Sequence, residues 1–141
     1  MTNEAYLSQI GELSRRIDYH RERLHRMCLE ADAVSSRWGE HGGAHTGDAP
    51  YVRMLERIEE YREQLEGEND LLLRLQAQAE EAIARLPEEK MRLVLLYKYM
   101  EGKSYLQIGD LMYMAKATAK QWQVRALKCL TLPDDPIVIC S

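Results

Sequence analysis

A heptad pattern of large and apolar residues occupies the start of the chain. From Tyr6 these residues recur at alternating steps of four and three, which predicts one long amphipathic helix. The seam consists of Tyr6, Ile10, Leu13, Ile17, His20, Leu24, Met27, Ala31 and Val34. His20 is its one polar member. We interpret it as a polar residue tolerated in the core, with a pH-sensitive switch as the alternative.

A second helical segment follows a glycine-rich stretch. Residues 38–50 hold four glycines and Pro50, which predicts a loop, with Asp48 as a candidate cap of the next helix. The second seam keeps the same spacing and consists of Tyr51, Leu55, Ile58, Arg62, Leu65, Asn69, Leu72, Gln76, Ala79, Ile83 and Leu86. Two helices of similar length joined by such a loop predict an antiparallel hairpin over residues 1–86.

Two shorter helices are predicted after the hairpin. Pro87 is expected at the first helical position of the first of them. Gly102 is expected to end that helix in a left-handed conformation. Ser104 and Gln107 have the spacing of a capping box, which predicts a short helix through Leu111.

A third helix is predicted over about 115–130, because prolines at 133 and 136 end regular helix. Three short helices in this order are typical of a helix-turn-helix domain, which we place at residues 87–130. Residues 131–141 form a C-terminal tail with an apolar stretch at Ile137–Cys140, and the pattern does not determine its position. The predicted fold class is therefore all-α, a long hairpin followed by a three-helix domain.

The charge distribution changes the picture that the total charge suggests. The 141 residues carry a net charge of −4. Residues 87–130 nevertheless hold eight basic and four acidic side chains, whereas residues 51–86 hold five basic and nine acidic ones. Within residues 114–130 there is no acidic side chain. This asymmetry favours an anionic partner for the C-terminal domain.

Membrane and secretory classes are not expected. No run approaches eighteen apolar residues, and the first residues lack a basic stretch followed by an apolar one. The three cysteines, Cys28, Cys129 and Cys140, are scattered, and Cys129 is interpreted as buried. A reducing, cytoplasmic location is the simplest interpretation.

No metal, cofactor or enzymatic activity is expected. Glu22 and His25 have the spacing of half of a di-iron site, but no second copy of this motif exists. His41 and His45 lie in the glycine-rich loop without a cysteine, so a surface role is favoured over metal binding. No nucleophile and base have a recognisable spacing, and there is no phosphate-binding glycine loop.

An ordered set of short motifs runs through the C-terminal domain. It comprises Leu86-Pro87-Glu88-Glu89, an apolar run Leu93–Tyr97, Gly102-Lys103-Ser104-Tyr105, Ile108-Gly109, Thr118 and Arg125-Ala126-Leu127. In order and spacing this set resembles region 4 of bacterial sigma factors, and the whole layout resembles small phage-encoded regulators with such a domain. The resemblance implies a helix-turn-helix that binds DNA, with RNA polymerase as a further partner. The turn glycine and the capping serine of that family correspond here to Tyr113 and Ala115.

The third helix is the candidate DNA-binding element. Its inward face is expected to comprise Ala115, Ala119, Trp122, Ala126 and Leu130. The predicted DNA-binding residues are Lys116, Ala117, Lys120, Gln121, Arg125 and Lys128, with Ser104 from the preceding helix. Lysine neutralises phosphate, and glutamine can bind adenine through two hydrogen bonds. Lysines also occur on any solvated helix face, and it is the surrounding motifs that favour DNA binding.

These features predict a DNA-binding transcriptional regulator of phage or prophage origin. It is expected to bind double-stranded DNA as a homodimer or higher homo-oligomer assembled through the hairpin. One alternative is a small terminase-like DNA-packaging protein, because those proteins also join a helix-turn-helix to an oligomerising hairpin. Another is a protein-interaction module that binds RNA polymerase or an anti-sigma partner without DNA.

Overall fold

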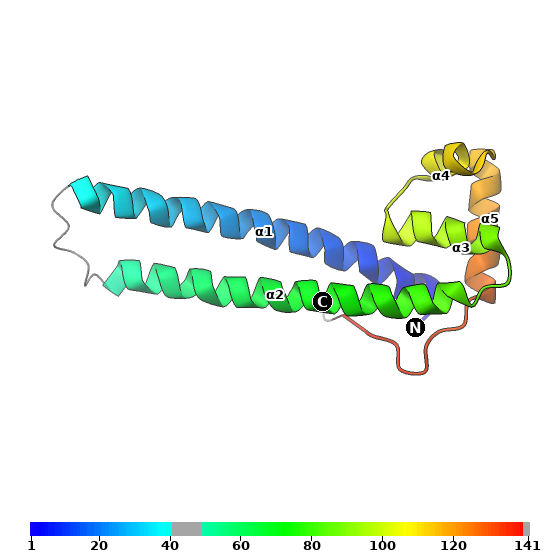
Figure 1. Cartoon of the computed structure of the whole chain (residues 1–141), viewed down its shortest axis with the longest axis horizontal. Helices are drawn as coiled ribbons and strands as arrows, with labels where there is room; N and C mark the ends of the chain where they lie inside the picture. Colours follow the sequence, from blue (N-terminus) through cyan, green and yellow to red (C-terminus); the bar gives the residue numbers. More distant parts are fainter. Residues whose placement is uncertain (41–48, 140–141) are drawn as a thin grey trace. The chain divides into compact units, whose positions relative to one another are not determined.

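The computed structural model describes residues 1–40 and 49–139, and the regular secondary structure of this part is all helical (Figure 1). Its elements are α1 (Asn3–Glu40), α2 (Ala49–Ala84), α3 (Glu89–Leu95), the π-helical turn η1 (Leu96–Met100), α4 (Tyr105–Met112) and α5 (Lys116–Cys129). The predicted all-α class is confirmed. Asp48, His41, His45 and Cys140 lie outside the described residues. In the described part, no helix has the length and apolar character needed to cross a membrane.

Contacts divide the chain into two compact units. The first combines Met1–Ser14 with Leu71–Ser141, and the second is Arg15–Asp70. The first unit therefore includes the start of α1 and the end of α2 together with the C-terminal helices. The domain boundary expected at Leu86 stays a prediction, because contacts within one chain do not show which segments fold independently.

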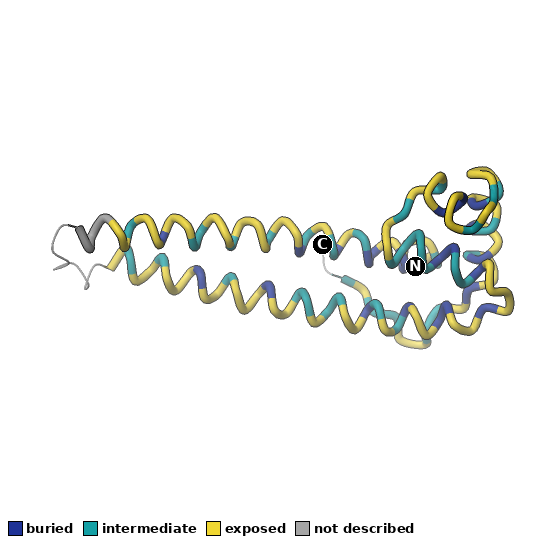
Figure 2. The backbone as a smooth tube through the Cα atoms, turned by 45° about the horizontal axis from the view of Figure 1, so that its top comes forward, coloured by how far each residue is buried: buried dark blue, intermediate teal, exposed yellow. Residues whose placement is uncertain are grey.

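The second unit is a helical hairpin. Its parts of α1 and α2 lie side by side in opposite directions, and buried positions recur where they face each other (Figure 2). Ile17 and Ala31 of α1 and Ile58 and Leu65 of α2 are buried, as the heptad spacing predicts. Two predicted seam members, Leu55 and Arg62, are exposed. Their assignment was wrong because the buried and half-buried positions of α2 keep the spacing of four and three with Met54 and Tyr61, one residue earlier, in their place.

His20 has a polar partner inside the hairpin. Its Nδ1 lies 2.6 Å from Oε1 of Glu68, and both side chains are largely buried. The imidazole also packs edge-on against the rings of Tyr19 and Tyr61. A buried polar group is tolerated when it is hydrogen-bonded, so Glu68 explains how the seam accommodates a histidine.

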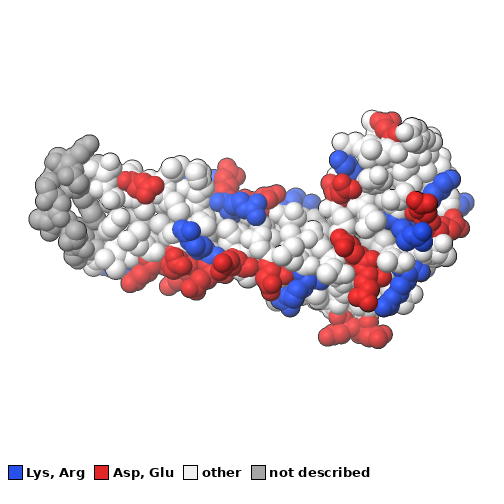
Figure 3. Space-filling view, viewed as in Figure 1, with Lys and Arg blue, Asp and Glu red and all other residues white. Residues whose placement is uncertain are grey.

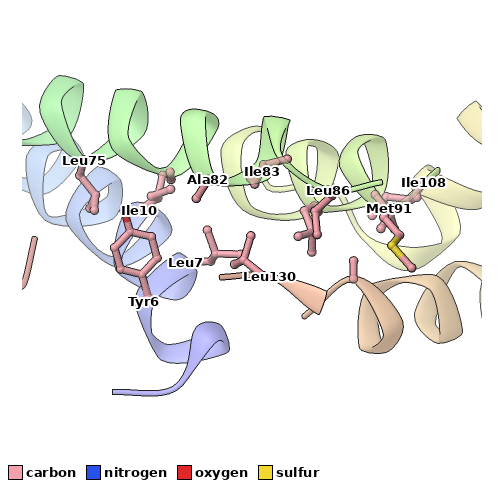
Figure 4. Close-up of a cluster of buried hydrophobic side chains, with 14 of the residues drawn as sticks. Tyr6, Leu7, Ile10, Leu75, Ala82, Ile83, Leu86, Met91, Ile108 and Leu130 are labelled. Atoms are coloured by element: carbon pink, nitrogen blue, oxygen red, sulfur yellow. The ribbon is translucent and has the colours of Figure 1, made fainter. Parts of the chain in front are cut away.

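One hydrophobic core holds the first unit together (Figure 4). It draws buried residues from α1, α2, α3, α4 and α5 and from the segments that join them: Tyr6, Leu7, Ile10, Leu75, Ala79, Ala82, Ile83, Leu86, Met91, Val94, Leu95, Ile108, Ala119, Ala126 and Leu130. Burying a leucine or isoleucine stabilises a fold by roughly 1.5–3 kcal/mol. The start of α1 is therefore part of the same core as the C-terminal helices.

The C-terminal tail is extended and is bound by two glutamine side chains. Gln9 donates from Nε2 to the carbonyl of Ile137 and accepts at Oε1 from the amide of Ile139, both at 2.9 Å. Gln78 accepts from the amide of Ile137 and donates to the carbonyl of Asp135, also at 2.9 Å. Ile137 and Ile139 are half-buried against the core. The tail thus docks on the first unit.

The start of α3 differs from the sequence-based expectation. Glu88 is extended, with φ −112° and ψ 138°, and acts as the N-cap, so α3 begins at Glu89. Pro87 precedes the cap and is not the first helical residue as predicted, because the extended Glu88 separates it from α3. Arg92 closes this turn by donating to the carbonyl of Leu86 at 2.6 Å.

Gly102 has the conformation expected of it. Its φ is +66°, a left-handed value that favours glycine. The amide of Lys103 then donates to the carbonyl of Tyr97 at 2.9 Å, which closes the end of η1. This bond joins residues six positions apart, one position more than at an α-helix end capped by a left-handed residue, because η1 is a π-helical turn.

Candidate nucleic-acid interface

The helix-turn-helix is formed by α4 and α5, and α4 begins with the predicted capping box. The hydroxyl of Ser104 accepts from the amide of Gln107 at 3.2 Å, and the Gln107 side chain accepts from the amide of Ser104 at 2.9 Å. The prediction is confirmed in both of its hydrogen bonds. Ser104 is exposed, and its hydroxyl is occupied in fixing the start of α4.

The turn between α4 and α5 is tight and conformationally unusual. Tyr113 ends α4 with φ 57° and ψ 48°, and its side chain is 96% exposed. Gly109 lies against the next stretch of chain, because a Cβ at this position would be 2.6 Å from the carbonyl oxygen of Met114. The amide of Met114 donates back to the carbonyl of Gly109 at 2.9 Å. The turn therefore requires a glycine at position 109 and holds the backbone of Tyr113 in a strained, left-handed conformation.

Replacing Tyr113 by glycine should stabilise the fold by about 0.5–1 kcal/mol. A left-handed conformation costs a residue with a Cβ roughly 1–2 kcal/mol. Glycine avoids this cost, but it loses more conformational entropy on folding, and that loss offsets part of the gain. Urea unfolding measures the effect. Tyr113→Ala is the matched control, because it removes the ring and keeps the strain. Equal stability of the glycine and alanine variants would contradict a strained turn.

A buried polar network joins α5 to its neighbours. The Gln123 side chain is 5% exposed, accepts a hydrogen bond from the Tyr105 hydroxyl and donates to the Tyr99 hydroxyl at 2.7 Å. Burial raises the pKa of Tyr99, and the hydrogen bond to Gln123 opposes this in part. Sequence reasoning missed this network. Gln123 follows the buried Ala119 by four residues, so its inward position was available from the helical repeat.

The outward face of α5 carries the predicted DNA-binding side chains. Lys116, Ala117, Lys120, Gln121, Arg125 and Lys128 are all exposed. Ala119 and Ala126 are fully buried on the opposite side, which confirms the predicted orientation of the helix. Ala115 was wrongly placed on the inward face: it is exposed and extended, and it is the N-cap of α5 with no side-chain hydrogen bond. Alanine cannot cap a helix through its side chain, so backbone geometry alone starts α5.

The two ends of α5 differ in their surroundings. Near its C-terminus, Nδ2 of Asn3 donates to the carbonyls of Leu127 and Leu130, both at 2.7 Å. Glu4 of α1 borders the same shallow pocket as Lys128. Lys128 is therefore near an acidic residue, about 18 Å along the helix from Lys116. Lys116 and Lys120 lie in the first two turns of α5, at the opposite end of the helix from Lys128 and Glu4.

Trp122 is half-buried between two cations. The Lys90 ammonium lies 5.6 Å and the Arg125 guanidinium 5.3 Å from the centre of its ring. This cation–π contact favours a position of the Arg125 guanidinium over the Trp122 ring. Cys129, interpreted from the sequence as buried, is exposed, because the last turn of α5 places it on the solvent side.

The C-terminal segment is similar to one known family. Residues 76–130 match the family model of sigma-70, region 4. The matched segment begins within α2, so the last turns of that helix belong to the sigma-70 region 4 match as well as to the hairpin predicted from the sequence. No curated protein and no solved structure shows significant similarity to the chain.

Exposed residues not predicted from the sequence also border the candidate interface. Val124 is 44% exposed between Lys120 and Lys128 on the outward face of α5, and Tyr113 projects from the turn before it. An apolar side chain in the major groove can contact the methyl group of thymine. Both kinds of charge occur on the face of the C-terminal helices that Figure 3 shows.

Proposed function

We propose that this chain is a DNA-binding transcriptional regulator in which α5 lies in the major groove. The observation that carries the proposal is the exposed first half of α5, with Lys116 and Lys120 beside Gln121, in a segment that matches sigma-70 region 4. Lysines at the start of the helix would bind phosphates and set its register on the duplex. Sequencing duplexes that bind the full chain from a random pool tests the proposal. Enrichment of one motif supports it, and an unenriched pool contradicts it.

Gln121 is the residue proposed to recognise a base. Gln121→Ala should weaken binding to the selected motif by about 1–3 kcal/mol, because a bidentate contact to adenine is lost. Binding to an unrelated duplex should change little, since phosphate contacts remain. Fluorescence anisotropy with both duplexes measures the two effects. An equal loss on both duplexes would contradict base recognition by Gln121.

The wider role follows from the resemblance to phage-encoded regulators. RNA polymerase is the proposed protein partner, and a phage or prophage is the proposed origin. The match to sigma-70 region 4 supports a regulator, whereas the long hairpin is also what a small terminase-like packaging protein would have. A module that binds RNA polymerase or an anti-sigma partner without DNA would give no enrichment in the duplex selection.

A homodimer is the proposed assembly, with a higher homo-oligomer as the alternative. Ile17 and Leu65 are buried within one chain, so a second copy would pack on outward residues of the hairpin such as Leu29 and Leu55. Light scattering should give about twice the chain mass of 16.4 kDa. A ring-sized mass would favour the packaging role. A monomer at tens of micromolar would rule out a two-fold DNA site.

A further inference from the structure

A groove runs between two side-chain stripes of the hairpin. On each helix the stripe residues are spaced by three, four or seven positions, so they share one face. The lining residues are Tyr19, Arg23, Arg26, Met27 and Glu30 of α1 and Pro50, Arg53, Met54 and Arg57 of α2. The groove has a volume of about 550 Å³ and lies wholly within the second unit. It is therefore independent of the candidate DNA interface.

Four arginines and one glutamate make the groove cationic. Arg26 has an ion pair with Glu22 at 3.5 Å, but both side chains are more than half exposed, and such pairs contribute little. Nε of Arg53 donates to the carbonyl of Ala49 at 3.3 Å. In residues 1–36 and 49–139, no carboxylate lies within ion-pair distance of Arg23, Arg53 or Arg57. The charges of Arg53 and Arg57 are available to a ligand, whereas the Arg23 guanidinium lies 5.8 Å from the centre of the Tyr61 ring.

The groove lies in a part of the chain that is otherwise acidic. Residues 15–70 hold nine arginines, no lysine and thirteen acidic side chains. Acidic side chains gather along the outer edge of α2, as Figure 3 shows. A nucleic-acid backbone is long and uniformly negative, so it would meet repulsion beyond the groove. A short anionic segment with a defined shape would not.

We propose that the groove binds an acidic amphipathic helix of a partner protein. Tyr19, Met27 and Met54 provide an apolar floor, and methionines adapt their shape to the side chains of a partner. The arginines at the rim would form charge-assisted hydrogen bonds with glutamates or aspartates on the flanks of the bound helix. A third helix laid along two antiparallel helices is an ordinary packing arrangement, recognised through residues spaced by three, four and seven.

The test uses the full chain and a synthetic helical peptide. The probe is a fluorescein-labelled peptide of about 18 residues, with leucines on one face and glutamates on the flanks. Fluorescence anisotropy should show saturable binding that weakens with salt. Arg53→Glu with Arg57→Glu should reduce the affinity by at least about tenfold, since two attractions become repulsions. A peptide with glutamine in place of glutamate should lose affinity in the same way.

The matched control is Arg21→Glu with Arg62→Glu, which changes the net charge equally on the same two helices outside the groove. This variant should bind the peptide within about twofold of the unchanged chain. Thermal unfolding checks that both variants fold, and Arg53→Gln with Arg57→Gln replaces the reversal if it does not fold.

Three outcomes would overturn the proposal. The first is no binding of the acidic peptide by the unchanged chain. The second is an equal loss of affinity in the groove variant and the control. The third is a groove variant that keeps peptide binding and instead loses duplex DNA or self-association, which would assign the groove to another occupant.

Discussion

Reversing the charges of Lys116 and Lys120 to glutamate should abolish duplex binding at moderate salt. Both side chains are exposed on the first two turns of α5, where a helix entering the major groove approaches phosphates. Each phosphate contact contributes about 0.9 to the slope of log affinity against log salt, so losing two should flatten that slope by roughly two units. Fluorescence anisotropy across a salt series measures both quantities.

The control for this variant is Arg15→Glu with Arg85→Glu. It makes the same change in net charge at two exposed positions outside α5, Arg15 on α1 and Arg85 just after the end of α2. The control should retain most of the affinity of the unchanged chain, and both variants should keep its thermal stability. Binding that survives reversal of Lys116 and Lys120 would show that α5 does not contact DNA.

Truncating Leu7 to alanine should lower the free energy of unfolding by about 2–5 kcal/mol. Leu7 is fully buried and lies in the core that joins the start of α1 to the C-terminal helices. The cost combines lost burial with the cavity left behind, and it should appear as a lower midpoint in urea. A segment near the N-terminus would thus determine the stability of a domain that begins more than sixty residues later.

Leu73→Ala is the matched control, since Leu73 lies on α2 in the same unit as Leu7 and is 65% exposed. Its effect should lie within about 0.5 kcal/mol. If Leu7→Ala were equally mild, the start of α1 would not belong to the core of the first unit.

Local sequence features predicted local structure well. The capping box of Ser104 and Gln107, the left-handed Gly102 and the buried heptad positions of α1 all follow from short-range rules, and the structure confirms them. The misplaced start of α3 at Pro87 and the exposed Ala115 are errors of one or two residues at helix ends. Such ends depend on how the chain turns between elements, which periodicity does not determine.

Contacts between distant residues could not be predicted. Asn3 binds carbonyls at the end of α5, and Gln9 and Gln78 hold the tail, across separations of 57 to 130 residues. A polar residue on a helix surface gives no indication of which distant carbonyl it will meet. The same holds for the groove arginines, which approach one another only because α1 and α2 fold into a hairpin.

The sequence predicted which candidate DNA-binding side chains of α5 are exposed, but not which of them have neighbours within the fold. The helical repeat places Lys116, Lys120 and Gln121 outside, and the structure agrees. The helical repeat does not reveal that Lys128 borders the same pocket as Glu4, or that the Arg125 guanidinium lies 5.3 Å from the centre of the Trp122 ring. Those contacts depend on the tertiary packing of α1 and α5.

Hydrogen–deuterium exchange of the full chain, with and without a duplex selected from the random pool, tests the central claim most directly. If α5 lies in the major groove, the bound duplex should slow exchange in the turn at Tyr113 and in the first two turns of α5. Amides of the hairpin between Arg15 and Asp70 should exchange as in the free chain. Protection confined to that hairpin, with none in α5, would contradict DNA binding by the helix-turn-helix.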